Sequence, residues 1–152
     1  ENLLSDIVFD WERMLDLRGN SAPYLLYAYA RLASILQKSK GQANRPSIEL
    51  KASKSKKVDF QLLEKKEELD LMRKVLEFPD AVKEAHDSLL TSNFCSYLYG
   101  LCGLANKFYE TTPILGDENV ARKKARLKLI EMTNKTLRNG LNLLGVRVLD
   151  NI

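Results

Sequence analysis

Apolar side chains recur every three or four residues along most of this 152-residue chain, and no segment alternates apolar and polar residues as a half-buried β-strand does. The pattern is clearest over residues 21–38, where Asn20-Ser21 followed by Pro23 is a typical helix start. One apolar stripe follows at 3.6-residue spacing: Leu25, Ala28, Leu32, Ile35 and Leu36. Helices of this kind bury their stripes against one another. The sequence therefore predicts an all-α fold, an antiparallel bundle of about five helices.

The four further helices are expected over residues 59–78, 80–90, 92–110 and 118–139. Pro79 ends the first of these and can start the next, Thr111-Thr112-Pro113 precedes the last, and Gly140 is expected to terminate it as a C-cap. Residues 92–110 are apolar on most faces and should be central, and the apolar tail 141–146 should pack down. Residues 40–58 are polar and basic, typical of a flexible loop. Within residues 59–78 the side chains expected to point inward are Leu62, Leu63, Leu69, Met72, Val75 and Leu76.

Composition and cysteine spacing favour a globular protein of a reducing compartment. Apolar residues make up 45% and charged residues 29% of the chain, and no apolar run approaches the roughly 20 residues that cross a bilayer. Cys95 and Cys102 lie two helical turns apart, too far for a disulfide, so both are expected to be buried free thiols. His86 has no second ligand at metal spacing, so no metal site is expected. We expect a cytoplasmic location and no membrane partner, and a first residue other than Met suggests a piece of a longer protein.

Basic residues gather in two stretches. Seven lie between Lys38 and Lys57 against the single acid Glu49, and seven lie between Val120 and Asn139 against Glu131. This asymmetry is compatible with a polyanionic partner such as nucleic acid, but charge alone favours the alternative that these are solvated helix faces.

Tyr24, Tyr27 and Arg31 fall within a sector of about 60° on the first helix, beside its apolar stripe. Two phenol rings and a guanidinium on one face suit an unstacked nucleic-acid base, because the rings stack on it and arginine adds charge and hydrogen bonds. The alternative is that the tyrosines cover the edge of the core while Arg31 forms an ion pair. Periodicity alone favours this alternative.

Four blocks resemble the arginyl-tRNA synthetase family. The run "GNSAPYLLYAYARLASILQK" (Gly19–Lys38) is similar to the family pattern G-x-T-x-P-Y-L-Q-Y-A-H-x-R-x-x-S-I-L. "FDWERMLD" (Phe9–Asp16) precedes it, and "YLYGLCGLANKFYETTPIL" (Tyr97–Leu115) and "ARLKLIEMTNKTLRNGLNLLGV" (Ala125–Val146) follow. The blocks keep the family's order and span nearly the whole chain, so the joint match is specific.

The resemblance implies that residues 19–152 form a helical anticodon-binding domain of the DALR type. It also implies that residues 1–18 are the last part of the segment that joins a catalytic core to this domain. It implies that an anticodon is received by Tyr24, Tyr27, Arg31, Tyr109 and Ile152. Candidate phosphate contacts are Lys54, Lys56, Arg122 and Lys123. Arginine codons share a middle G, so the middle anticodon C of their tRNAs is a sensible base to read.

The chain departs from the family pattern at three positions. Leu26 replaces the usual Gln and Tyr29 the usual His, which puts polar contacts from both positions in doubt. Ile152 stands where the family usually ends in Met, an exchange that an apolar contact with a base could survive although the flexible thioether is lost.

Catalysis is not expected from this chain alone. The string "KASKS" (residues 51–55) is one residue from the KMSKS loop of class I synthetases. It nevertheless follows the first helix instead of preceding the domain, and the sequence has neither Rossmann strands nor a HIGH-type motif. A Lys/Ser-rich loop produces such strings by composition.

The parent protein is expected to be an arginine–tRNA ligase that uses ATP and Mg²⁺. The chain itself is expected to be a monomer that binds arginine tRNA, needs no cofactor and lies against its own catalytic domain. The alternative function is a non-enzymatic helical domain that binds protein.

Overall fold

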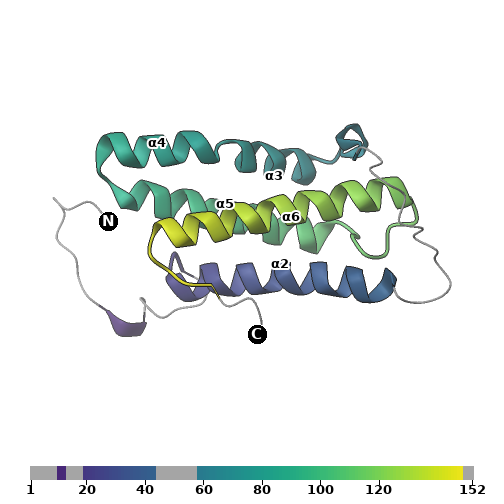
Figure 1. Ribbon diagram of the computed structural model, residues 1–152, viewed down its shortest axis with the longest axis horizontal. Coiled ribbons are helices and arrows are strands. Elements are labelled where there is room, and N and C mark those ends of the chain that lie inside the picture. The colour runs from purple at the N-terminus through teal and green to yellow at the C-terminus, as the bar shows by residue number, and fades with distance from the viewer. Residues whose placement is uncertain (1–9, 13–18, 44–57, 149–152) are drawn as a thin grey trace.

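The computed structural model describes residues 10–12, 19–43 and 58–148, and the last two of these ranges form a helical bundle (Figure 1). Its helices are α2 (Ala22–Ala43), α3 (Lys66–Leu76), α4 (Phe78–Ser88), α5 (Thr91–Thr111) and α6 (Val120–Leu143), with a short 3₁₀ turn at Phe60–Leu62. No strand occurs in these described ranges. The all-α, five-helix fold predicted from the sequence is therefore confirmed.

The five helices form four rods. α3 and α4 lie end to end along one side of the bundle, α2 runs along the opposite side, and α5 and α6 lie between them (Figure 1). α2 and α5 run in the same direction, since Tyr24 meets Tyr99 while Arg31, two turns later, meets Tyr109. The central position expected for residues 92–110 is also confirmed, because α5 contacts all four other helices. The side chains that α5 buries are Phe94, Tyr97, Leu98, Leu101, Cys102, Ala105 and Phe108.

The start of the second predicted helix is wrong. Instead of continuing from Asp59, the chain makes the 3₁₀ turn, in which the Asp59 carboxylate accepts a hydrogen bond from the Gln61 backbone N–H. α3 begins only at Lys66, where the Glu68 carboxylate accepts a bond from the Lys65 backbone N–H. Local side-chain-to-backbone bonds of this kind compete with a continuous helix.

Leu76 was expected to point inward but is 65% exposed, because the buried side of α3 centres on Glu68, Leu71 and Val75. Pro79 does not end that helix. It occupies the first turn of α4, where a missing N–H costs nothing, so its expected place at the start of the next helix is confirmed.

The predicted end of the last helix is also wrong, because Gly140 lies inside α6 and not at its C-cap. A Cβ placed on Gly140 would lie within 3.1 Å of one Leu98 methyl carbon and closer still to the other. Glycine is therefore needed for the close approach of α5. The left-handed residue beyond the helix is Gly145, at φ 76°. The expected packing of the tail 141–146 holds for Leu141, which is fully buried, but is wrong for Leu143, which is 61% exposed at the end of α6.

The first helix extends to Ala43, so the first four residues of the predicted loop 40–58 are helical. Residues 44–57 lie outside the described ranges. None of the described helices is long and apolar enough to span a bilayer.

Candidate nucleic-acid interface

α2 presents Tyr24, Tyr27 and Arg31 beside its buried stripe. The helix starts at Ala22, and the Tyr24 backbone N–H approaches the Ser21 hydroxyl oxygen at 3.4 Å. Tyr24 is half-buried, whereas Tyr27 is 55% exposed. The two departures from the family pattern lie off this face, since Tyr29 is buried and Leu26 packs partly against the core.

α5 supplies the other half of the site. The ring centroids of Tyr24 and Tyr99 lie 5.1 Å apart, and the Arg31 guanidinium carbon lies 4.5 Å from the centroid of the Tyr109 ring. Arg31 therefore makes a cation–π contact with an aromatic residue 78 positions later in the sequence. We call this surface the α2–α5 face and define it as Tyr24, Tyr27, Arg31, Tyr99, Asn106, Tyr109 and Glu110.

Polar contacts connect the two helices behind the rings. The Asn106 carbonyl oxygen accepts a hydrogen bond from Arg31 Nη1 at 3.4 Å, and Asn106 Nδ2 donates to the Tyr24 hydroxyl at 3.1 Å. Glu110 lies 3.6 Å from Arg31 Nη1 and is exposed. The ion pair expected under the alternative reading of Arg31 is thus present, and it shares the guanidinium with the Tyr109 ring.

Burial raises the pKa of Tyr24 above its ordinary value near 10, an effect that the hydrogen bond from Asn106 partly opposes. The phenol is therefore neutral and keeps its proton at physiological pH. A neutral phenol with one hydrogen-bond partner can still donate to a ligand.

Of the remaining predicted site residues, the structure describes two. Arg122 donates two hydrogen bonds to the Asp117 carboxylate, at 2.7 and 2.8 Å, and Lys123 Nζ donates to the Leu115 backbone oxygen. Both side chains therefore already have partners near the start of α6. Lys54, Lys56 and Ile152 lie outside the described residues.

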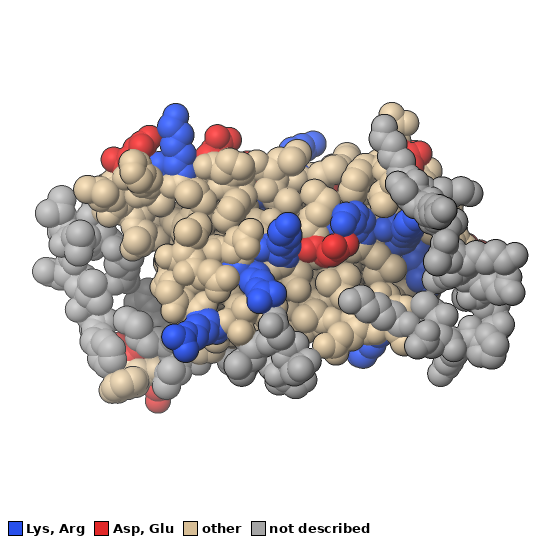
Figure 2. Space-filling model, in the orientation of Figure 1, with Lys and Arg blue, Asp and Glu red and all other residues tan. Residues whose placement is uncertain are grey.

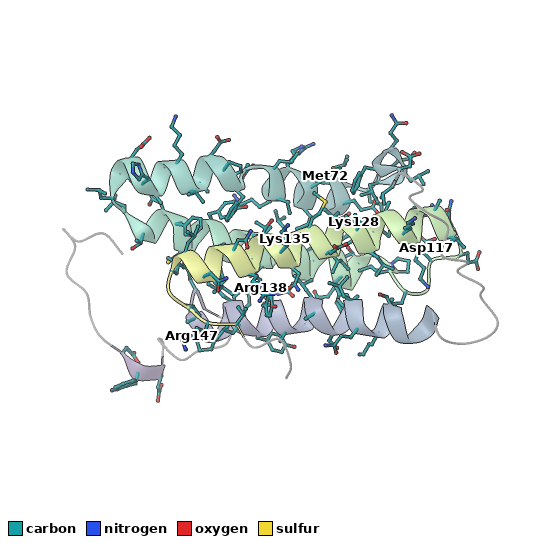
Figure 3. All side chains as sticks on the ribbon, in the orientation of Figure 1. Met72, Asp117, Lys128, Lys135, Arg138 and Arg147 are labelled. Atoms are coloured by element: carbon teal, nitrogen blue, oxygen red, sulfur yellow. The ribbon has the colours of Figure 1, made fainter. Side chains whose placement is uncertain are left out.

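Other basic side chains gather over α6. Lys128, Lys135 and Arg138 follow one another along the helix, with Arg147 just beyond its end (Figure 3). On the same view, lysines and arginines form a broken strip across the middle of the surface (Figure 2). Lys128 is paired with Glu131 at 2.9 Å, as a solvated helix face commonly is.

Arg126, which belongs to the second basic stretch of the sequence, is buried and faces the core. Its guanidinium bonds to the carboxylates of Glu68 and Asp117, both buried, and to the Pro113 backbone oxygen. This arrangement ties the turn between α5 and α6 to the first turn of α3. Arg126 is therefore not available to a polyanion, although it belongs to the basic stretch that is compatible with one.

Sequence reasoning missed three residues of the α2–α5 face: Tyr99, Asn106 and Glu110. Their spacing of seven and four residues places them on one side of α5, which is the signal that could have found them. No three His, Cys, Asp or Glu side chains among the described residues cluster as metal ligands would. The described part of the face offers aromatic planes, one cation paired with the Glu110 carboxylate, and amide and hydroxyl groups, which suits a stacked base with polar edges.

The chain resembles arginyl-tRNA synthetases over nearly all its length. Residues 25–152 match the model of the DALR anticodon binding domain. The chain is 39% identical over 150 residues to an arginine–tRNA ligase of Shewanella baltica, covering 99% of this chain and 24% of that protein. It is 42% identical over 146 residues to one of Vibrio parahaemolyticus, covering 96% and 23%.

A solved arginyl-tRNA synthetase of Thermus thermophilus superposes with a TM-score of 0.75 at 28% identity, covering 95% of this chain and 23% of that one. The chain thus spans about a quarter of the length of these relatives. Because the DALR model matches well over half of its residues, the chain belongs to the DALR anticodon-binding domain family.

Proposed function

We propose that this chain is the anticodon-binding part of an arginyl-tRNA synthetase and holds the anticodon loop of an arginine tRNA on the α2–α5 face. The observation that carries this proposal is the cation–π contact of Arg31 on Tyr109 beside the exposed Tyr27 ring. Unpaired bases of RNA stack on aromatic rings and on arginine planes. In a member of an anticodon-binding family, this is the surface best suited to that task.

The rest of the parent's activity belongs to parts not included in this chain. We propose that the parent joins arginine to its tRNA with ATP and Mg²⁺, that residues 1–18 lead from its catalytic domain, and that the chain is a cytoplasmic monomer. By this proposal the 152-residue chain catalyses nothing. Arginine-dependent ATP–pyrophosphate exchange by the chain alone would contradict this.

Binding of a hairpin RNA with the anticodon stem and loop of an arginine tRNA tests the site. Stacking on an aromatic side chain contributes about 1–3 kcal/mol per base, so Tyr27→Ala should weaken binding about 5- to 150-fold. Arg31→Ala should also weaken binding and reduce its salt dependence by about one charge. The matched control is Arg73→Ala, which removes an exposed arginine paired with Asp70 on α3.

Two results would contradict the assignment. One is that Tyr27→Ala and Arg31→Ala both bind as tightly as Arg73→Ala at matched salt. The other is that a hairpin with its middle anticodon base exchanged binds equally well. Equal binding of the two hairpins is what the alternative function, a protein-binding domain, predicts.

A further inference from the structure

The hydrogen bonds of Asn106 determine how the α2–α5 face can recognise a base. Asn106 is half-buried between α2 and α5 and touches a ligand-facing side chain at each end of its amide. Its contacts join Arg31 to Tyr24, which are seven residues apart on α2. The inference drawn from them rests on the proposed function of this face.

Chemistry fixes the direction of this amide. The oxygen and nitrogen of an asparagine amide have nearly the same shape, so their placement follows from the partners. Arginine only donates hydrogen bonds, so the Asn106 oxygen has to face Arg31. The NH₂ group is then left facing Tyr24. A flipped amide would set two donors against each other at Arg31.

The amide direction in turn fixes the role of the Tyr24 hydroxyl. Because that hydroxyl accepts the bond from Asn106 Nδ2, its own hydrogen is available to a third group. No described residue accepts a bond from it. The contact with Tyr99 restricts the ring, so the hydroxyl is directed before any ligand arrives.

We propose that Asn106 is a positioning residue that makes Tyr24 a hydrogen-bond donor toward RNA. The face thereby selects an unpaired base that offers an acceptor, a carbonyl oxygen or an unprotonated ring nitrogen, and disfavours one that offers an amino group there. Arg31, a donor only, adds to the same preference. A base that offers an amino group there leaves the hydrogen of the Tyr24 hydroxyl without an acceptor, which is costly when water is excluded, whereas Arg31 keeps its bonds to Asn106 and Glu110.

Asn106→Asp tests the proposal, because it keeps the shape of the side chain and reverses its polarity. A carboxylate accepts from both Arg31 and the Tyr24 hydroxyl, so the lone pairs of that hydroxyl then face the RNA. The affinities of four hairpins that differ only in the middle anticodon base are measured. The ratio between the preferred base and the other three should fall about fivefold, the equivalent of one net hydrogen bond.

Two comparison proteins separate this effect from added charge and from direct contact. Asn139→Asp adds the same charge at an exposed position of α6 and should change all four affinities by one factor, leaving the ratios unchanged. In a Tyr24→Phe background, Asn106→Asp should leave the ratios unchanged within about twofold, because no hydroxyl remains to reverse.

The outcomes are distinct. Unchanged ratios for Asn106→Asp overturn the inference but leave the proposed function intact if Tyr27→Ala still weakens binding. A ratio change that persists in the Tyr24→Phe background means that Asn106 contacts the RNA itself, which also overturns it. Absence of salt-sensitive binding to every hairpin overturns the proposed function and the inference together. Should Asn106→Asp fail to fold, Tyr24→Phe alone decides, and unchanged base ratios refute the role of the hydroxyl.

Discussion

Replacing Arg126 by methionine removes a buried cation from between two buried carboxylates. Arg126 is 2% exposed and Glu68 fully buried, and the Pro113 backbone oxygen loses a 2.9 Å hydrogen bond as well. Removing one partner of a buried ion pair typically costs about 3–5 kcal/mol, because the other charge stays desolvated. In a domain of this size that is a fall in Tm of roughly 6–20 °C.

Urea unfolding followed by circular dichroism measures this loss, and Lys128→Met is the matched control. Lys128 lies on the same helix and pairs with Glu131, but its side chain is 42% exposed, so its loss should cost under about 0.5 kcal/mol. Adding Glu68→Met to Arg126→Met removes both charges of the Arg126–Glu68 ion pair and should recover part of the stability. A loss below about 1 kcal/mol for Arg126→Met, or one equal to that of the control, would refute the reasoning.

The same variant should change the acid dependence of stability. The hydrogen bonds from Arg122 hold the pKa of Asp117 at about 2, below its ordinary value of 3.8, and the charge of Arg126 contributes to this lowering. A carboxylate whose pKa is lowered by folding stabilises the protein above its unfolded pKa and loses this effect as the pH falls toward the folded value. The protein should therefore lose stability between pH 4 and pH 2, and Arg126→Met should lose less. Equal slopes in both proteins would contradict the role of Arg126.

Two further predictions concern close packing. Gly140→Ala should destabilise the protein by about 1–3 kcal/mol, because the new methyl group meets Leu98, and Gly140→Ala combined with Leu98→Ala should cost less than the sum of the two single changes. Gly103→Ala is the control, since a Cβ there meets open space, and it should stabilise α5 by up to about 1 kcal/mol. Equal effects of Gly140→Ala and Gly103→Ala in urea unfolding would contradict the packing argument. Burial raises the pKa of the Cys102 thiol to about 12, so iodoacetamide at pH 8 should modify the half-buried Cys95 and spare Cys102 until urea is added, as mass spectrometry of the peptides would show.

Periodicity predicted the helices because each carries its own apolar stripe, and it failed where a distant residue decides. Gly140 resembles a helix end in the sequence, yet its role depends on Leu98, 42 positions away in the sequence and on another helix. Arg126 resembles one more solvated charge, but its partner Glu68 lies 58 positions earlier. Local sequence contains neither of these pairings.

The candidate site was predictable in the same partial way. The positions of Tyr24, Tyr27 and Arg31 on α2 follow from helical spacing, and the resemblance added Tyr109, which the structure places on Arg31. Asn106 was not found, because a polar residue in an apolar helix gives no sign of which neighbours it will bond. Whether these side chains bind an anticodon stays a prediction.

Helical spacing places Tyr24 and Tyr27 on one face of α2 and predicts the same exposure for both, but packing against α5 half-buries Tyr24 alone. Tyr24 is half-buried, hydrogen-bonded by Asn106 and in contact with Tyr99, so much of its side-chain entropy is lost on folding and not on binding. Tyr27 is exposed and has to be ordered by the ligand itself. Truncation of Tyr24 should therefore lower both the free energy of unfolding and the affinity for RNA, whereas truncation of Tyr27 should lower the affinity alone. An equal loss of folding stability in the two variants would show that the contacts with α5 do not hold Tyr24 in place.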